Sequence, residues 1–160
     1  MILRSILLIV LALLSVFSFS CQAKQTTHSD FNLLFQYGVF ERNILDTFSN
    51  TYTKDMVGDP PITIDLQLTD EEKQKIYDKI IEIDFFNYPD EFDYPVSIPP
   101  SSYSIYVDYY SKTKCCHWGY ISLDSDPRVG KLKELARLIQ DIVESKKEYK
   151  RLPEPRGAYL

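Results

Sequence analysis

The stretch "ITIDLQLTDEEKQKIYDKI", residues 62–80, decides the fold because its apolar period changes part-way along. From Ile62 to Leu68 apolar and polar residues alternate, which predicts a half-buried β-strand. Thr69 is followed three residues later by Glu72, and this pair predicts a capping box that starts a helix. The apolar residues of that helix fall on one face: Ile76, Tyr77, Ile80, Ile81 and Ile83.

The residues before this stretch also predict strands. Phe31 to Val39 alternate with period two, as a half-buried strand does. Asp46 to Tyr52 ("DTFSNTY") is interpreted as a second strand, and the sequence "GDPP" at Gly58–Pro61 as the breaker that separates it from residues 62–68.

After the helix, which we expect to end before Pro89, the proline-rich residues 84–102 predict a long loop. Tyr103–Tyr110 and Cys115–Leu123 alternate again and predict a hairpin whose loop is Ser111–Lys114. Asp126 and Pro127 then predict the start of a second helix. Its apolar face is formed by Leu132, Leu135, Ala136, Leu138, Ile139, Ile142 and Val143.

This order of elements predicts an α+β fold. An antiparallel sheet of about five strands with two helices packed on one face, a two-layer sandwich, buries both apolar surfaces. We expect residues 31–160 to form a single globular domain with an extended C-terminal tail.

The amino terminus has the layout of a signal peptide, residues 1–20, with Arg4 before an apolar run. The uncharged run from Ser5 to Ser20 is shorter than the ~20 residues that a membrane-spanning helix requires. The run ends at Cys21, as in bacterial lipoproteins, although Ser18 and Phe19 depart from their usual pattern; ordinary cleavage without lipidation stays open.

Lipidation of Cys21 would anchor the chain firmly, because each buried methylene contributes about 0.8 kcal/mol. Residues 21–30 would then be the lipidated cysteine and its tether, with the domain outside the cytoplasm at the cell membrane or outer membrane. The formal net charge of −5 makes a nucleic-acid partner unfavourable. No motif for a cofactor is recognised, so we expect none.

Several segments resemble small, uncharacterised bacterial lipoproteins in which a lipoprotein-type signal peptide precedes a domain of unknown function. These segments are Tyr37-Gly38, "NILDTF" (residues 43–48), "YTKD" (residues 52–55), "LTDEEKQKIYDKI" (residues 68–80) and "EYKRLPEPRGAYL" (residues 148–160). The resemblance implies a secreted, lipid-anchored domain and no catalytic residues.

The sequence "KCCHWGY" is the one place that suggests site chemistry. If Tyr110 faces Cys115, Asp108 pairs with His117, and Cys115 and His117 share a sheet face that Cys116 does not. Two functional interpretations follow. Cys115, His117 and Asp108 could bind a metal, or form a nucleophilic site, although residues i and i+2 of a strand are about 6.6 Å apart. The plain alternative is an exposed Asp108–His117 pair and a core Cys116.

A binding surface is the other candidate. Aromatic and polar residues of the hairpin and the proline-rich loop could contact a protein or a glycan: Tyr106, Asp108, Tyr110, His117, Tyr88 and Tyr94. The alternative is that the aromatic side chains close over the core. The favoured hypothesis is a non-enzymatic, lipid-anchored envelope module that binds a protein or glycan. The alternative is an envelope metal-binding protein or enzyme.

Overall fold

The computed structural model of the chain describes residues 30–93, 95, 97–119 and 126–159. The predicted signal peptide, the lipidation site at Cys21 and almost all of the predicted tether lie outside the described residues. Within the described part, no helix is long and apolar enough to cross a membrane. The elements, in chain order, are β1 (Phe31–Val39), β2 (Asn43–Asp46), β3 (Thr51–Met56), β4 (Asp59–Asp65), α2 (Asp70–Glu82), η1 (Phe85–Asn87), β5 (Ser101–Tyr109), β6 (Lys112–Gly119), α3 (Pro127–Ser145) and η2 (Tyr149–Arg151).

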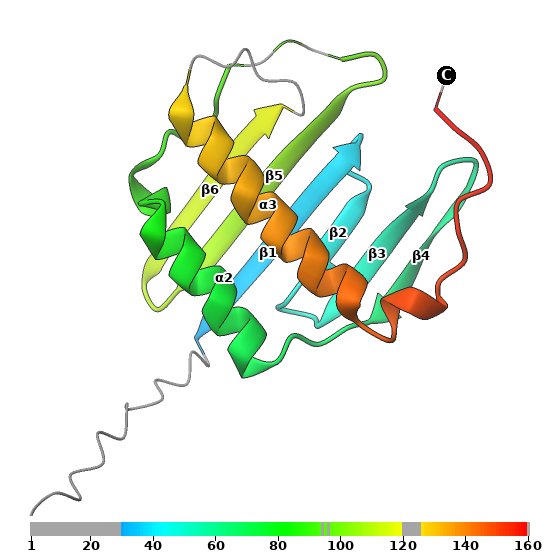
Figure 1. Cartoon of the computed structure of the whole chain (residues 1–160), viewed down its shortest axis with the longest axis horizontal. Coiled ribbons are helices and arrows are strands. Elements are labelled where there is room, and N and C mark those ends of the chain that lie inside the picture. Colours follow the sequence, from blue (N-terminus) through cyan, green and yellow to red (C-terminus); the bar gives the residue numbers. More distant parts are fainter. Residues whose placement is uncertain (1–29, 94, 96, 120–125, 160) are drawn as a thin grey trace, which may run out of the picture.

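The six strands form one antiparallel sheet in the order β4-β3-β2-β1-β5-β6. Helices α2 and α3 both lie on one face of the sheet, and α3 crosses it diagonally (Figure 1). Phe35 of β1, Ile76 of α2 and Leu135 of α3 are fully buried between the two layers. The predicted two-layer α+β architecture is therefore confirmed.

Both helices begin as the sequence predicts. The amide of Glu72 donates to Thr69 Oγ1 at 3.3 Å and the amide of Thr69 donates to Glu72 Oε2 at 2.8 Å, which is a complete capping box. At α3 the Asp126 carboxylate accepts from the amide of Arg128 at 2.9 Å. One residue of the predicted apolar face differs: Ile81 is 51 % exposed, because it lies about 100° round the helix axis from Ile80, outside the buried stripe of Ile76, Ile80 and Ile83.

The predicted strand over Asp46–Tyr52 is wrong, because residues 47–50 form the turn between β2 and β3. The carboxylate of Asp46 accepts from the amides of Phe48 at 2.8 Å and Ser49 at 3.2 Å, and Asn50 adopts a positive φ of 54°. The sheet consequently has six strands, where the sequence pattern indicated about five.

Strand β4 begins at Asp59 and ends at Asp65, so it includes the prolines that were interpreted as a breaker. Pro60 and Pro61 are tolerated because β4 is an edge strand and its pairing with β3 is irregular between Lys54 and Met56, so neither proline has a partner in the register. Leu66 and Leu68, predicted to be strand residues, instead lie buried beyond its end.

The hairpin of β5 and β6 has the predicted faces but a different register. Its loop is the two residues Tyr110 and Ser111, and β6 begins at Lys112. Cys115 therefore pairs with Tyr106 and not with Tyr110. The shift is an even number of residues, and because strand faces alternate with period two, each side chain keeps its predicted face.

Candidate functional site

The side of the sheet opposite the helices, called here the outer sheet face, is the first candidate site. The described residues that project from it, by strand alternation, are Asn32, Leu34, Gln36, Ile44, Asp46, Thr53, Ser104, Tyr106, Asp108, Cys115 and His117. They are half-buried or exposed, in contrast to the fully buried residues of the inner face. This surface is therefore accessible across most of the sheet.

His117 is the polar centre of the outer sheet face. Its Nε2 lies 2.9 Å from Oε1 of Glu41, and the same oxygen accepts a hydrogen bond from Ser102 Oγ at 2.6 Å. Its Nδ1 lies 3.9 Å from Oε1 of Glu91, whose side chain is 72 % exposed. The imidazole thus lies between two carboxylates and can exchange hydrogen bonds with a ligand on this face.

Local backbone geometry places these groups. Glu41 lies in the turn between β1 and β2, where Phe40 and Glu41 both adopt positive φ angles, 52° and 54°. The backbone of His117 also holds the proline-rich loop, because its N–H donates to Asp90 O at 2.9 Å and its carbonyl accepts from Phe92 N at 3.0 Å. The loop is therefore fastened to the open edge of β6 beside the imidazole.

Asp108 lies on the outer sheet face but opposite Thr113, and Ser104 is the residue opposite His117. The predicted Asp108–His117 pair is wrong, since the two-residue loop moves the register. Among the described residues, no group of three His, Cys, Asp or Glu side chains is arranged to hold a metal ion. The alternative set of Cys115, His117 and Asp108 is not brought together.

The aromatic candidates divide between surface and core. Tyr106 lies on the outer sheet face with its ring 6.1 Å from that of Phe48, and Tyr110 is 65 % exposed at the hairpin loop. Tyr88 belongs to the core, where its ring contacts Phe92 at 6.0 Å, so its predicted place on an exposed surface is wrong. Tyr94 lies outside the described residues.

The two cysteines of the hairpin lie on opposite faces, as predicted. Cys115 is exposed and Cys116 is fully buried under the helices. Burial raises the pKa of the Cys116 thiol to about 12, because a thiolate would lose its hydration there. Cys116 is therefore a core residue and takes no part in surface chemistry.

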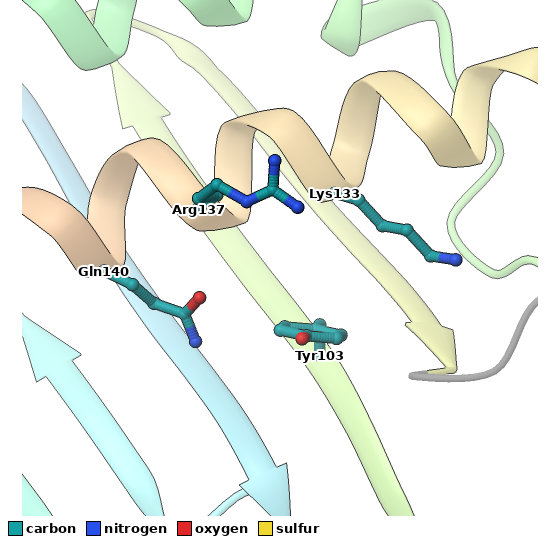
Figure 2. Close-up of a pocket in the computed structure, with 4 residues that line it drawn as sticks. All are labelled: Tyr103, Lys133, Arg137 and Gln140. Carbon is teal, nitrogen blue, oxygen red and sulfur yellow. The ribbon is translucent and has the colours of Figure 1, made fainter.

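A second candidate lies on the helix side and was not recognised in the sequence. An open groove of about 480 Å³ lies beside α3 and is lined by Tyr103, Lys133, Arg137 and Gln140 (Figure 2). We call it the α3 groove. Its only sequence signal is the spacing of Lys133, Arg137 and Gln140, which puts the three on one side of a helix.

A buried polar cluster formed by residues of β1, β2 and β3 was also not predicted from the sequence. The hydroxyl groups of Tyr37 and Tyr52 lie 2.8 Å apart, and burial raises the pKa of both. Asn43 joins them, since its Oδ1 accepts from the Tyr52 hydroxyl at 3.4 Å and from the amide of Asp55 at 3.0 Å. Its amide nitrogen would be 3.0 Å from a Cβ on Gly38, whose φ of 88° also favours glycine.

Lys54 connects this cluster to the C-terminal tail. Its ammonium donates to Pro153 O at 3.1 Å, lies 3.5 Å from Glu154 Oε1 and sits 5.0 Å from the ring centre of Tyr149. The side chain is 7 % exposed, and the Tyr159 hydroxyl hydrogen-bonds the neighbouring Asp55. The tail thereby covers the part of the inner face over β3 and β4, on the same side as α3 (Figure 1).

Comparison with known proteins gave no matching family model and no curated protein of significant similarity. Candidate activities consequently come from the geometry of the chain itself.

Proposed function

We propose that the chain is a lipid-anchored protein of the bacterial cell envelope, and that it is a non-enzymatic module that binds a protein or a glycan through its outer sheet face. One structural observation carries the binding half of the proposal: both helices cover one side of a six-stranded sheet, and the other side remains accessible. The signal-peptide layout that ends at Cys21 carries the anchoring half.

The chemistry of the outer sheet face suits recognition. Tyr106 and Phe48 supply an aromatic surface, which can stack on a sugar ring or an apolar side chain. His117 and Glu41 supply a hydrogen-bonding pair whose side chains are 31 % and 21 % exposed. Aromatic groups beside fixed polar groups are typical of binding surfaces.

The position of the anchor agrees with this use of the face. The tether joins the sheet at Phe31, and residues 22–30 can span at most about 30 Å when extended. His117 lies toward the opposite end of the strands, because it pairs with Ser104 while Phe31 pairs with Tyr109. A partner could reach the His117–Glu41 pair without competing with the membrane.

The anchor is tested by labelling cells with an alkyne fatty acid. We expect label on the wild-type chain and none on Cys21→Ala, with the variant lost from the membrane fraction. Unlabelled wild-type protein in the medium would contradict the anchor and leave the binding proposal to be judged on its own.

Binding is tested with the full chain in its own membranes, carrying a photoreactive phenylalanine analogue in place of Tyr106. The matched control carries the same analogue at Lys75, an exposed position on α2. We expect a discrete cross-linked product, protein or glycan, from position 106 alone. Retention of the wild-type chain on purified cell-wall glycan, lost in Tyr106→Ala, would identify a glycan partner. A cross-linked product without such retention would identify a protein partner. Equal cross-linking from both positions, with no retention on glycan, would contradict the proposal.

A further inference from the structure

The α3 groove differs in composition from the rest of the surface. The chain carries 23 acidic and 18 basic residues, yet the described lining of this groove has two cations and no carboxylate. Lysine, arginine, the glutamine amide and the tyrosine hydroxyl all donate hydrogen bonds. A concave site lined by donors and by one sign of charge concentrates ions of the opposite sign.

The three helix side chains border this opening. Figure 2 shows Lys133, Arg137 and Gln140 extending from α3 over the same space, with Tyr103 of β5 on its far side. Arg137 and Gln140 form no hydrogen bond or ion pair with another described residue. Their donors are therefore open to a ligand.

Tyr103 is held rigidly in the wall of the groove. Its ring stacks on Trp118 of β6, with centroids 5.3 Å apart and planes 10° apart. It also stacks on Phe35 of β1, with centroids 6.3 Å apart and planes 16° apart. Because β1 and β6 flank β5, both faces of the ring are covered, and Tyr103 forms a fixed part of the wall.

We propose that the α3 groove binds a small soluble organic anion through a phosphate or carboxylate group. Arg137 matches such a group with two parallel hydrogen bonds, Lys133 adds a second positive charge, and Gln140 adds a neutral donor. The volume of about 480 Å³ exceeds what one phosphate or carboxylate fills, and it lies in the range of small-molecule sites. The ligand therefore carries a polar body, of about the size of a monosaccharide, beside its anionic group. This site is on the opposite side of the sheet from the outer sheet face and does not depend on it.

The test is calorimetric titration of the full chain in a nonionic detergent with glucose 6-phosphate, glucuronate and uncharged glucose. We expect at least one of the two anions to bind and glucose to give no measurable heat. The phosphate and carboxylate arms identify the preferred group. Affinity should fall as salt is raised, because salt screens exposed charges.

Matched variants locate the site. Arg137→Gln should weaken anion binding about tenfold or more, since it removes a charge-assisted, two-point contact. Lys131→Gln removes the same charge from the same helix about 200° round its axis from Lys133, and should leave binding unchanged. Thermal melts check that both variants fold. Tyr106→Ala, on the outer sheet face, should bind the anion as the wild type does.

Three results would overturn the proposal: no heat with either anion at millimolar concentration, glucose binding as tightly as the anions, or equal effects of Arg137→Gln and Lys131→Gln. None of them bears on the outer sheet face, whose partner is assayed by cross-linking at Tyr106.

Discussion

The imidazole Nε2 of His117 lies 2.9 Å from the carboxylate Oε1 of Glu41, so a turn between the first two strands is joined to the last strand of the sheet. β1 and β6 are not neighbours, because β5 lies between them. Ser102 of β5 completes the link, since its hydroxyl donates to the same oxygen at 2.6 Å. The polar centre of the outer sheet face is thus also a contact between three separate segments.

A double-mutant cycle measures this contact. Glu41→Ala and His117→Ala should each lower the free energy of unfolding by about 1 kcal/mol, and the coupling between them should be about 0.5 kcal/mol, because the pair is partly exposed. Glu91 provides the matched control, since its carboxylate lies 3.9 Å from His117 Nδ1 and is 72 % exposed. Urea denaturation should give a coupling near zero for Glu91 and His117. Equal couplings for the two carboxylates would contradict the geometry.

The helix assignments predict different losses of stability for two substitutions. Thr69→Ala should cost about 1 kcal/mol, because the amide of Glu72 loses its cap. Leu135→Ala should cost about 2–5 kcal/mol, because it opens a cavity where α3 packs on the sheet. Thr113→Ala, at an exposed position of β6, is the control and should change little. Negligible effects of both test variants, measured by urea denaturation, would mean that neither side chain has its described role.

The parts of the fold that local chemistry determines were predictable. The capping box at Thr69 and the period-two alternation of β1 depend only on neighbouring residues, and both are confirmed. The strand predicted over Asp46–Tyr52 was wrong because the Asp46 carboxylate accepts from the Phe48 amide and the Ser49 hydroxyl and so forms a turn, although threonine and aromatic residues are common in strands. Local pattern alone does not separate the two.

The register of the β5–β6 hairpin was predicted incorrectly for a different reason. Lys112 and Lys114 were assigned to the loop because they lie between the two alternating runs, but β6 is an edge strand, where lysines are favoured since they discourage pairing with other chains. The spacing of Lys133, Arg137 and Gln140 did not reveal the α3 groove, because the groove also depends on how α3 crosses β5. The burial of Lys54 likewise depends on a tail that lies far away in the sequence.

Four of the five segments on which the expected resemblance to bacterial lipoproteins rests lie around that buried lysine. Tyr37-Gly38, residues 43–48, residues 52–55 and the C-terminal tail supply the buried cluster and its cover. These four segments thus contain residues that hold the fold together.

Lys54 should therefore stabilise the domain through the tail. Lys54→Ala should lower the free energy of unfolding by about 1–3 kcal/mol, because the largely buried ammonium of Lys54 loses its charge-assisted hydrogen bond to Pro153 O. Truncation after Leu152 should cost a similar amount. The two changes should be non-additive, because they break the same contacts. Lys150→Ala, at an exposed position of η2, is the control for loss of a lysine. Full additivity in urea denaturation would show that Lys54 acts independently of the tail.

The two adjacent cysteines of β6 should differ sharply in reactivity. In a Cys21→Ser variant, which removes the third thiol, a thiol reagent should modify Cys115 rapidly and Cys116 only after denaturation, because Cys116 is fully buried. Cys115→Ser should abolish the rapid phase. Raising the pH from 7 to 10 should not make Cys116 reactive, because its pKa of about 12 keeps the folded thiol protonated.

The same pKa predicts a loss of stability at high pH. Folding raises the pKa of Cys116 from 9.0 to about 12, so its contribution is complete below pH 9 and is lost as the pH rises toward 12. Cys116→Val, which keeps the volume and removes the thiol, should lose less stability than the wild type between pH 8 and pH 10.5. Buried Tyr37 and Tyr52 act in the same direction in both proteins, so the difference isolates Cys116.

If Cys116, and not Cys115, proved to be the rapidly modified thiol, the inner and outer faces of β6 would be exchanged. His117 would then lie under the helices, and the proposed binding surface would lose its polar centre.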